Sequence, residues 1–135
     1  MAAVLEGRPR EILEAPNYVV LSIPREDGSV QSVVVWAHLD DDHVTLNSAI
    51  GRGWPANLQR TKKATVLAMA DSNPYEWVAV EGELVEASTE GADDHIDQLA
   101  KKYLDADSYP YRNEAEQRIS FWLRPTRIRY NAPMG

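Results

Sequence analysis

The feature that most constrains the fold of this 135-residue chain is a series of short, β-branched-rich segments that alternate with turn residues. The segments expected to form strands are 18–23, 30–39, 43–47, 64–70, 75–86 and 119–130. Asp27-Gly28 separates the first two in the manner of a tight hairpin. Short strands with turn chemistry between them are typical of a small barrel, so we expect a mainly β, six-stranded fold.

Two of these segments carry finer expectations. The middle of 30–39 is continuously apolar, which predicts burial on both faces of the sheet. Pro125 interrupts the last segment, and a proline within a strand indicates either a sheet edge or a bulge.

Three helices are expected to flank the strands, over 4–14, 55–60 and 91–104. In the last of these, Ile96, Leu99 and Tyr103 recur at helical spacing, which predicts an amphipathic helix. Because the chain has no internal repeat and no linker, residues 1–135 are expected to form one domain. The helices would cap the barrel or cover one of its openings.

Composition excludes several classes of function. The net charge of −7 argues against a general nucleic-acid-binding protein, because such proteins bind by neutralising phosphates. The absence of cysteine excludes disulfides and thiolate metal sites, and it agrees with a cytoplasmic location. No apolar run approaches the roughly 18 residues that a membrane span needs. No histidine has the spacing of a metal site, and no residue is identified as catalytic.

Residues 51–63, GRGWPANLQRTKK, collect two glycines, a Trp-Pro pair and four basic residues in an acidic chain. Glycines that allow close approach, backbone N–H groups at a helix start and nearby cations together form a typical anion site. The other interpretation is a surface loop whose lysines simply begin the next strand. Trp54 is unusual because a core role is hard to build in a polar, Gly-rich loop. Its ring could stack on a ligand or close a subunit interface.

The order of these elements resembles a known family. The stretch DGSVQSVVVWAHLDDDHVTLNSAIGRGWPANLQR is followed by ATVLAMADSNPYEWVAVEGELVE, IDQLAKKYL and ISFWLRPTRIRYN. This series is similar to the flavin- and deazaflavin-dependent oxidoreductases of the pyridoxamine 5′-phosphate oxidase superfamily, in their F-420-associated branch. The resemblance implies a six-stranded FMN-binding split β-barrel, which forms a homodimer with two cofactor sites at the interface.

The resemblance also implies which residues bind the cofactor. Val34, Val35 and Trp36 would lie beside the ring system of the cofactor. Asn47 and Ser48 would contact the ring or the ribityl chain. Those of the phosphate-binding loop would be Arg52, Gly53, Trp54, Pro55 and Asn57. The anion of the basic loop is then the cofactor's phosphate and, in F-420, also its lactyl-oligoglutamyl tail.

One departure from the family pattern concerns the phosphate. Many relatives read GRxKxRNL, whereas this chain has Trp54 and Ala56 at the positions of the lysine and the second arginine. Two cations are therefore missing, and a hydrogen bond to a charged group contributes about 1.5–3 kcal/mol. Arg60, Lys62 or Lys63 could replace them, or backbone amides could carry the phosphate.

The function implied by the resemblance is an F-420-dependent reductase. It would transfer a hydride between the deazaflavin and a small, electron-poor organic acceptor. The chemistry would belong to the cofactor, which explains why no acid–base pair stands out in the sequence. Three alternatives stay open: an FMN-dependent oxidoreductase of the same fold, a non-catalytic F-420- or flavin-binding protein, and a structural dimer without a ligand.

Overall fold

The computed structural model describes residues 3–133, which form one antiparallel sheet and three helices. The strands are β1 (Val19–Pro24), β2 (Val30–Val35), β3 (Ala37–Asp40), β4 (His43–Ala49), β5 (Lys63–Ala70), β6 (Asn73–Ser88) and β7 (Arg118–Asn131). The helices are α1 (Gly7–Glu14), α2 (Gly53–Thr61) and α3 (Ala92–Leu104). The strand order across the sheet is β2-β1-β5-β6-β7-β4-β3.

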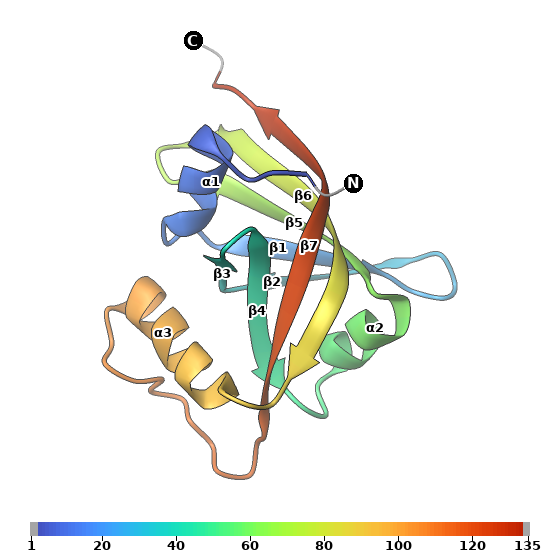
Figure 1. Cartoon of the computed structure of the whole chain (residues 1–135), viewed down its shortest axis with the longest axis vertical. Coiled ribbons are helices and arrows are strands. Elements are labelled where there is room, and N and C mark those ends of the chain that lie inside the picture. Colours follow the sequence, from blue (N-terminus) through green and yellow to red (C-terminus); the bar gives the residue numbers. More distant parts are fainter. Residues whose placement is uncertain (1–2, 134–135) are drawn as a thin grey trace.

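The sheet curves around the core and the helices cover its sides (Figure 1). In this view β4 and β7 cross the front and the β1–β2 hairpin passes behind them. Helix α1 packs against β3, β5 and β6, α2 against β1, and α3 against β4 and β7. The expected mainly β fold with flanking helices is therefore confirmed.

The expected strand 30–39 is two strands, which raises the strand number from six to seven. The break falls at Trp36, and it sends β2 and β3 to opposite ends of the sheet order. The expectation of burial on both faces is wrong for β2. Its residues alternate between half-buried and exposed, because β2 is an edge strand with one face on the core. A continuous apolar run does not distinguish such a strand from one buried on both sides.

Pro125 marks a bulge within the sheet. Strand β7 lies between β6 and β4, so the proline is not at an edge. The register passes from Glu81 opposite Arg127 to Gly82 opposite Pro125, which leaves Thr126 as the extra residue. The Thr126 hydroxyl donates to the Glu81 carbonyl at 3.1 Å, and this bond supports the irregular backbone. The sequence predicted either a sheet edge or a bulge at Pro125, and the bulge is confirmed.

The core fills the interior of the curved sheet. Fully buried side chains from distant strands meet there, including Leu21 of β1, Val44 of β4 and Phe121 of β7. Leu58 of α2 and Ile12 of α1 close the core from two sides. Among residues 3–133, no helix is long and apolar enough to span a membrane. Within the same residues, no group of His, Asp and Glu side chains could hold a metal ion.

Candidate functional site

A pocket of about 280 Å³ lies between the edge strand β2, the strand β4, helix α3 and the start of α2. Seven of the ten residues expected at a cofactor site line it: Val34, Val35, Trp36, Asn47, Ser48, Arg52 and Trp54. The chain reaches this pocket through a turn at Gly51, whose φ of +98° favours glycine. Residues far apart in the sequence are thus brought together where β2 ends, β4 ends and α2 begins.

The other three expected residues lie outside this pocket. Gly53 and Asn57 line a neighbouring surface depression, and Pro55 is a buried residue of α2. The Asn57 side chain donates to Gln31 Oε1 at 3.2 Å and accepts from Arg60 at 2.8 Å. The bond to Gln31 attaches α2 to β2, and the bond from Arg60 lies within α2, so Asn57 has a structural role.

Aromatic rings form one wall of the pocket. The Trp36 ring stacks on Tyr103 of α3, with centroids 5.4 Å apart and an interplanar angle of 6°. Tyr109, from the segment between α3 and β7, meets Trp36 edge-on at 6.1 Å. The Tyr103 hydroxyl is fixed by its bond to the Asn17 carbonyl at 2.7 Å. Held between these neighbours, the Trp36 ring offers a rigid, flat aromatic surface to a planar ligand.

Trp54 combines two environments. Its ring lies 5.5 Å from Phe121 and packs against the main hydrophobic core, while it also borders the pocket. The expectation that a core role would be hard to build for Trp54 is therefore wrong. Helix α2 turns the side chain inward from the loop, and the loop's polar composition gave no indication of this.

Arg118, at the start of β7, is the residue that sequence reasoning missed. It lines the pocket and is only 9% exposed. Its Nε donates to Asn47 Oδ1 at 3.0 Å, and its guanidinium lies 5.2 Å from the centre of the Tyr109 ring. Burial has the largest effect on the pKa of Arg118 and lowers it. The nearby Arg52 also lowers this pKa, whereas Tyr109, Glu116 and Asp93 raise it. The sequence feature that could have indicated Arg118 as a site residue is its place as a cation at the first position of a buried strand.

Arg118 is also incompletely paired. The ion pairs around the pocket belong to Arg52, which lies 2.7 Å from Glu116, and to Arg112, and within residues 3–133 Arg118 forms none. Buried charges in proteins are normally paired. A buried guanidinium that faces a pocket without a carboxylate partner favours an anionic ligand.

The cations proposed as replacements for the missing loop residues lie elsewhere. Arg60 donates to the Pro24 carbonyl at 3.0 Å and to Asn57. Lys62 and Lys63 follow the last turn of α2, whereas the pocket lies at its first turn. Arg118 is the second cation at the pocket, beside Arg52.

The start of α2 adds backbone donors to the same place. Arg52 is the N-cap residue, and no side chain caps the helix there. The first N–H groups of a helix have no intrahelical partner and carry a partial positive charge. Arg118 and these amides, with Arg52 and its partner Glu116 beside them, form a positively polarised end of an otherwise aromatic pocket.

Asn47 connects this pocket to a buried polar network. Its Nδ2 donates to the Ala92 carbonyl at 2.9 Å and lies 3.2 Å from His95 Nδ1. The same His95 nitrogen is 2.7 Å from the Ser120 hydroxyl. Burial lowers the pKa of His95 to about 4, so the ring is neutral at neutral pH. The network fixes Asn47 with its Oδ1 toward Arg118.

The model of the pyridoxamine 5′-phosphate oxidase family matches residues 5–132. An F-420 reductase superposes with a TM-score of 0.81 and 20% identity, over 92% of this chain and 98% of the other. A conserved hypothetical protein from Mycobacterium tuberculosis superposes with a TM-score of 0.72 and 14% identity, over 99% of this chain and 92% of the other.

A putative pyridoxamine 5′-phosphate oxidase from Listeria innocua gives a TM-score of 0.60 and 15% identity, over 84% of this chain and 87% of the other. No curated protein matches the sequence. At these identities the likeness to the solved structures concerns the fold, which is the split barrel. The family match covers nearly the whole chain, and the chain therefore belongs to the pyridoxamine 5′-phosphate oxidase family.

Proposed function

We propose that this protein is an F-420-dependent oxidoreductase that transfers a hydride between the deazaflavin and a small, electron-poor organic acceptor. The observation that carries the proposal is Arg118, a buried guanidinium that lies at one end of an aromatic-walled pocket and forms no ion pair with any described residue, 3–133. A planar ring joined to a phosphate has the shape and charge that such a pocket complements.

The chain's own residues would bind and orient the cofactor. Arg52, Arg118 and the first amides of α2 would hold the phosphate, and Asn47 and Ser48 would contact the ring or ribityl chain. The backbone of β2 and the Trp36 ring would flank the ring system and exclude water. When bound, the deazaflavin supplies the hydride chemistry. No carboxylate or histidine lines this pocket among residues 3–133, in agreement with that division of roles.

The proposal includes a homodimer with the cofactor at the interface. The outward face of the sheet carries an apolar cross-strand row of Val34, Val20 and Leu67, which ends at the buried Ala79. Val34 is 67% exposed, and Tyr18 beside it is 58% exposed. Exposed apolar side chains that lie together on one face support an interaction site there.

The same face adjoins the pocket, because Val34 and Tyr18 also line it. A second copy of the chain seated on this face would therefore cover both the apolar row and the open side of the pocket. The volume of about 280 Å³ within one chain lies at the lower limit for small-molecule sites, which supports a site completed by the partner.

FMN is the alternative cofactor, because the same arginines and amides would hold its phosphate. The absence of a carboxylate and a histidine from the pocket lining also favours, as a second candidate, a non-catalytic protein that binds F-420 or a flavin. Turnover with a panel of nitro and enone acceptors, in the presence of reduced F-420, separates this candidate from the enzyme.

The test of the proposal is a fluorescence titration of the purified protein with oxidised F-420, run in parallel with FMN. We expect saturable binding of F-420 at low micromolar concentration and weaker binding of FMN. Tighter binding of FMN would assign the protein to the flavin alternative. If neither cofactor binds at high micromolar concentration, the proposal is wrong.

A further inference from the structure

A second cavity, of about 470 Å³, lies between α3 and the strands β3, β4 and β7. The His95–Asn47 network separates it from the cofactor pocket, since His95 lines the second cavity and Asn47 lines the first. Its volume is within the range of small-molecule binding sites. The proposed hydride transfer makes no use of this cavity.

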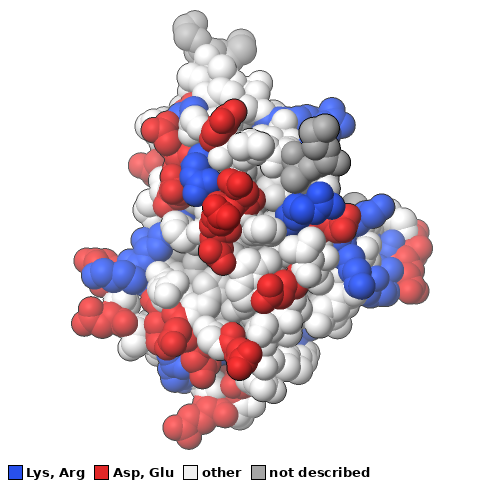
Figure 2. Space-filling model, viewed as in Figure 1, with Lys and Arg blue, Asp and Glu red and all other residues white. Residues whose placement is uncertain are grey.

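Three carboxylates lie around this cavity: Asp40 of β3, Asp94 of α3, and Glu90 just before α3. Within residues 3–133 none of the three forms an ion pair, although their neighbours Asp42 and Asp93 do. In the space-filling view, acidic side chains border the pale surface between α3 and β7 (Figure 2). Carboxylates outnumber the lysine of the lining, Lys102, so the net charge around the cavity is negative.

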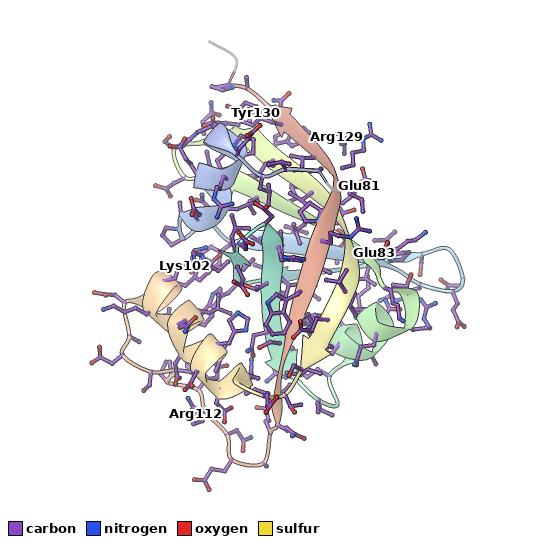
Figure 3. The ribbon with its side chains drawn as sticks, viewed as in Figure 1. Glu81, Glu83, Lys102, Arg112, Arg129 and Tyr130 are labelled. Atoms are coloured by element: carbon purple, nitrogen blue, oxygen red, sulfur yellow. The ribbon has the colours of Figure 1, made fainter. Side chains whose placement is uncertain are left out.

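The one lysine in the lining is not available to a ligand. Lys102 lies at the end of α3 (Figure 3), and its ammonium donates to the carbonyls of Leu13 and Ala37, both at 2.7 Å. His38 Nδ1 lies 3.1 Å away, close enough to accept the third N–H. An ammonium has three N–H donors, so all of them are occupied. Burial lowers the pKa of Lys102 to about 8. The ammonium is still largely protonated at neutral pH, and its hydrogen bonds tie α3 to α1 and β3.

Trp122 provides an aromatic wall that is coupled to one of the carboxylates. Its indole Nε1 donates to Asp40 Oδ2 at 3.0 Å, which fixes the ring and the carboxylate relative to each other. The His95 ring is nearly parallel to it, at 6.4 Å and 18°, and is neutral at neutral pH. Leu39 and Leu99 supply apolar surface to the same cavity.

An aromatic face beside a carboxylate recognises an ammonium group through cation–π and charge interactions. Apolar surface next to it accommodates a hydrocarbon body. We propose that this cavity is a binding site for an organic cation, a small molecule with an ammonium group on an apolar or aromatic body. The site is independent of the cofactor pocket and does not rest on the proposed hydride transfer.

Three probes with one body and different charges test this site: 4-phenylbutylamine, 4-phenylbutanol and 4-phenylbutyrate. Binding is followed by ¹H–¹⁵N NMR at the indole N–H of Trp122, assigned by its loss in Trp122→Phe. We expect the amine to shift this signal and to bind at least about tenfold more tightly than the alcohol, with no binding of the carboxylate. Equal affinity for amine and alcohol, or no saturable shift with millimolar amine, would overturn the proposal.

A matched pair of variants locates the site. Asp94→Asn removes one carboxylate of the lining, and we expect it to weaken amine binding about fivefold. Asp93→Asn makes the same change at the preceding residue of α3. Asp93 does not line the cavity, and it pairs with Arg112 at 3.5 Å. This substitution should leave the affinity unchanged. An equal loss in both variants, or shifts confined to Trp36 and Trp54, would place the amine elsewhere and contradict the proposal.

Discussion

At the scale of single residues, Arg118 shows how binding and stability compete. Removing its guanidinium from water is unfavourable, and the protein offers it one amide oxygen and one aromatic face in return. Binding of an anionic ligand would offset this unfavourable burial of the Arg118 charge. Substitution of Arg118 should therefore affect binding and folding in opposite directions.

We expect Arg118→Gln to weaken F-420 binding at least about tenfold, because it removes a charge-assisted contact worth about 1.5–3 kcal/mol. The thermal midpoint of the cofactor-free protein should stay the same or rise. Arg124→Gln is the control, because Arg124 lies on the same strand and pairs with Glu83 at 3.4 Å. The affinity of Arg124→Gln for F-420 should match that of the wild type. Unchanged binding in Arg118→Gln would remove Arg118 from the site.

Trp54→Ala should lower the free energy of unfolding by about 3 kcal/mol, because it removes an aromatic side chain packed against Phe121 and the core. Urea denaturation of the cofactor-free protein measures this change. Trp54→Phe retains an aromatic ring and should recover most of the loss. A loss below about 1 kcal/mol in Trp54→Ala would show that the ring serves the pocket alone.

At the scale of secondary-structure elements, α1 is attached to the sheet by one buried carboxylate. Glu76 of β6 is 7% exposed and accepts from Arg8 Nε and from its terminal nitrogen, both at 2.8 Å. The Tyr130 hydroxyl donates to the same carboxylate at 2.6 Å. Helix α1 is short and has no side-chain cap, so this contact and the burial of Ile12 and Leu13 hold it in place.

The Glu76 contact predicts a specific pH dependence. The bond from Arg8, followed by that from Tyr130, lowers the pKa of Glu76 to about 2 from an ordinary value of 4.5. A depressed carboxyl pKa stabilises the fold above the unfolded-state pKa, and this contribution is lost as the pH falls toward 2.

Glu76→Gln should accordingly be less stable than the wild type at pH 7, and the difference should shrink between pH 4.5 and 2. Urea denaturation at a series of pH values measures it. Glu83→Gln, at a half-exposed carboxylate, serves as the control and should show little difference at any pH. A difference for Glu76→Gln that does not vary with pH would contradict this assignment.

The bulge at Pro125 depends on a glycine in the neighbouring strand. A Cβ at Gly82 would lie 3.2 Å from the Leu123 Cβ and 3.4 Å from the Arg124 carbonyl oxygen. Gly82→Ala should therefore lower the free energy of unfolding by about 1–3 kcal/mol, as overpacking does elsewhere.

Gly53→Ala is the matched control for Gly82→Ala. Its new Cβ would meet nothing closer than the flexible Gln31 amide, at 3.7 Å. Chemical denaturation without cofactor should show no loss of stability for Gly53→Ala. Equal stability of Gly82→Ala and the wild type would mean that the bulge can relax.

At the scale of the whole molecule, the apolar outer face of β2, β1 and β5 and the open pocket beside it have the same proposed explanation. Both would be covered by a second copy of the chain. The mass of 15.2 kDa per chain makes the assembly state directly measurable.

We expect the wild type to scatter light as a particle of twice the chain mass, and Leu67→Glu to behave as a monomer with weakened F-420 binding. A charge in the centre of an apolar interface is unfavourable because it stays unpaired. Val85→Glu places the same charge at an exposed residue of β6 outside the cross-strand row, and it should remain dimeric. A monomeric wild type, or a dimeric Leu67→Glu, would contradict the proposed interface.

Local patterns in the sequence were sufficient to predict most of the elements. Alternation, turn residues and helical spacing located the strands after residue 43 and the helix α3 to within a few residues, and Pro125 indicated the bulge. These signals depend on the preferences of neighbouring residues, which are contained in short stretches of chain. The family resemblance supplied seven residues that the structure brings together in one pocket.

The tertiary structure decided what depends on contacts between distant residues. The break at Trp36 separates two strands that an apolar run had joined, because closure of the barrel requires β2 and β3 at opposite ends of the sheet. Arg118 reaches Asn47 across 71 positions of sequence, and Trp54 reaches the core through the orientation of α2. Pairing and burial of this kind are set by the packing of the whole chain, and no local stretch of sequence records them.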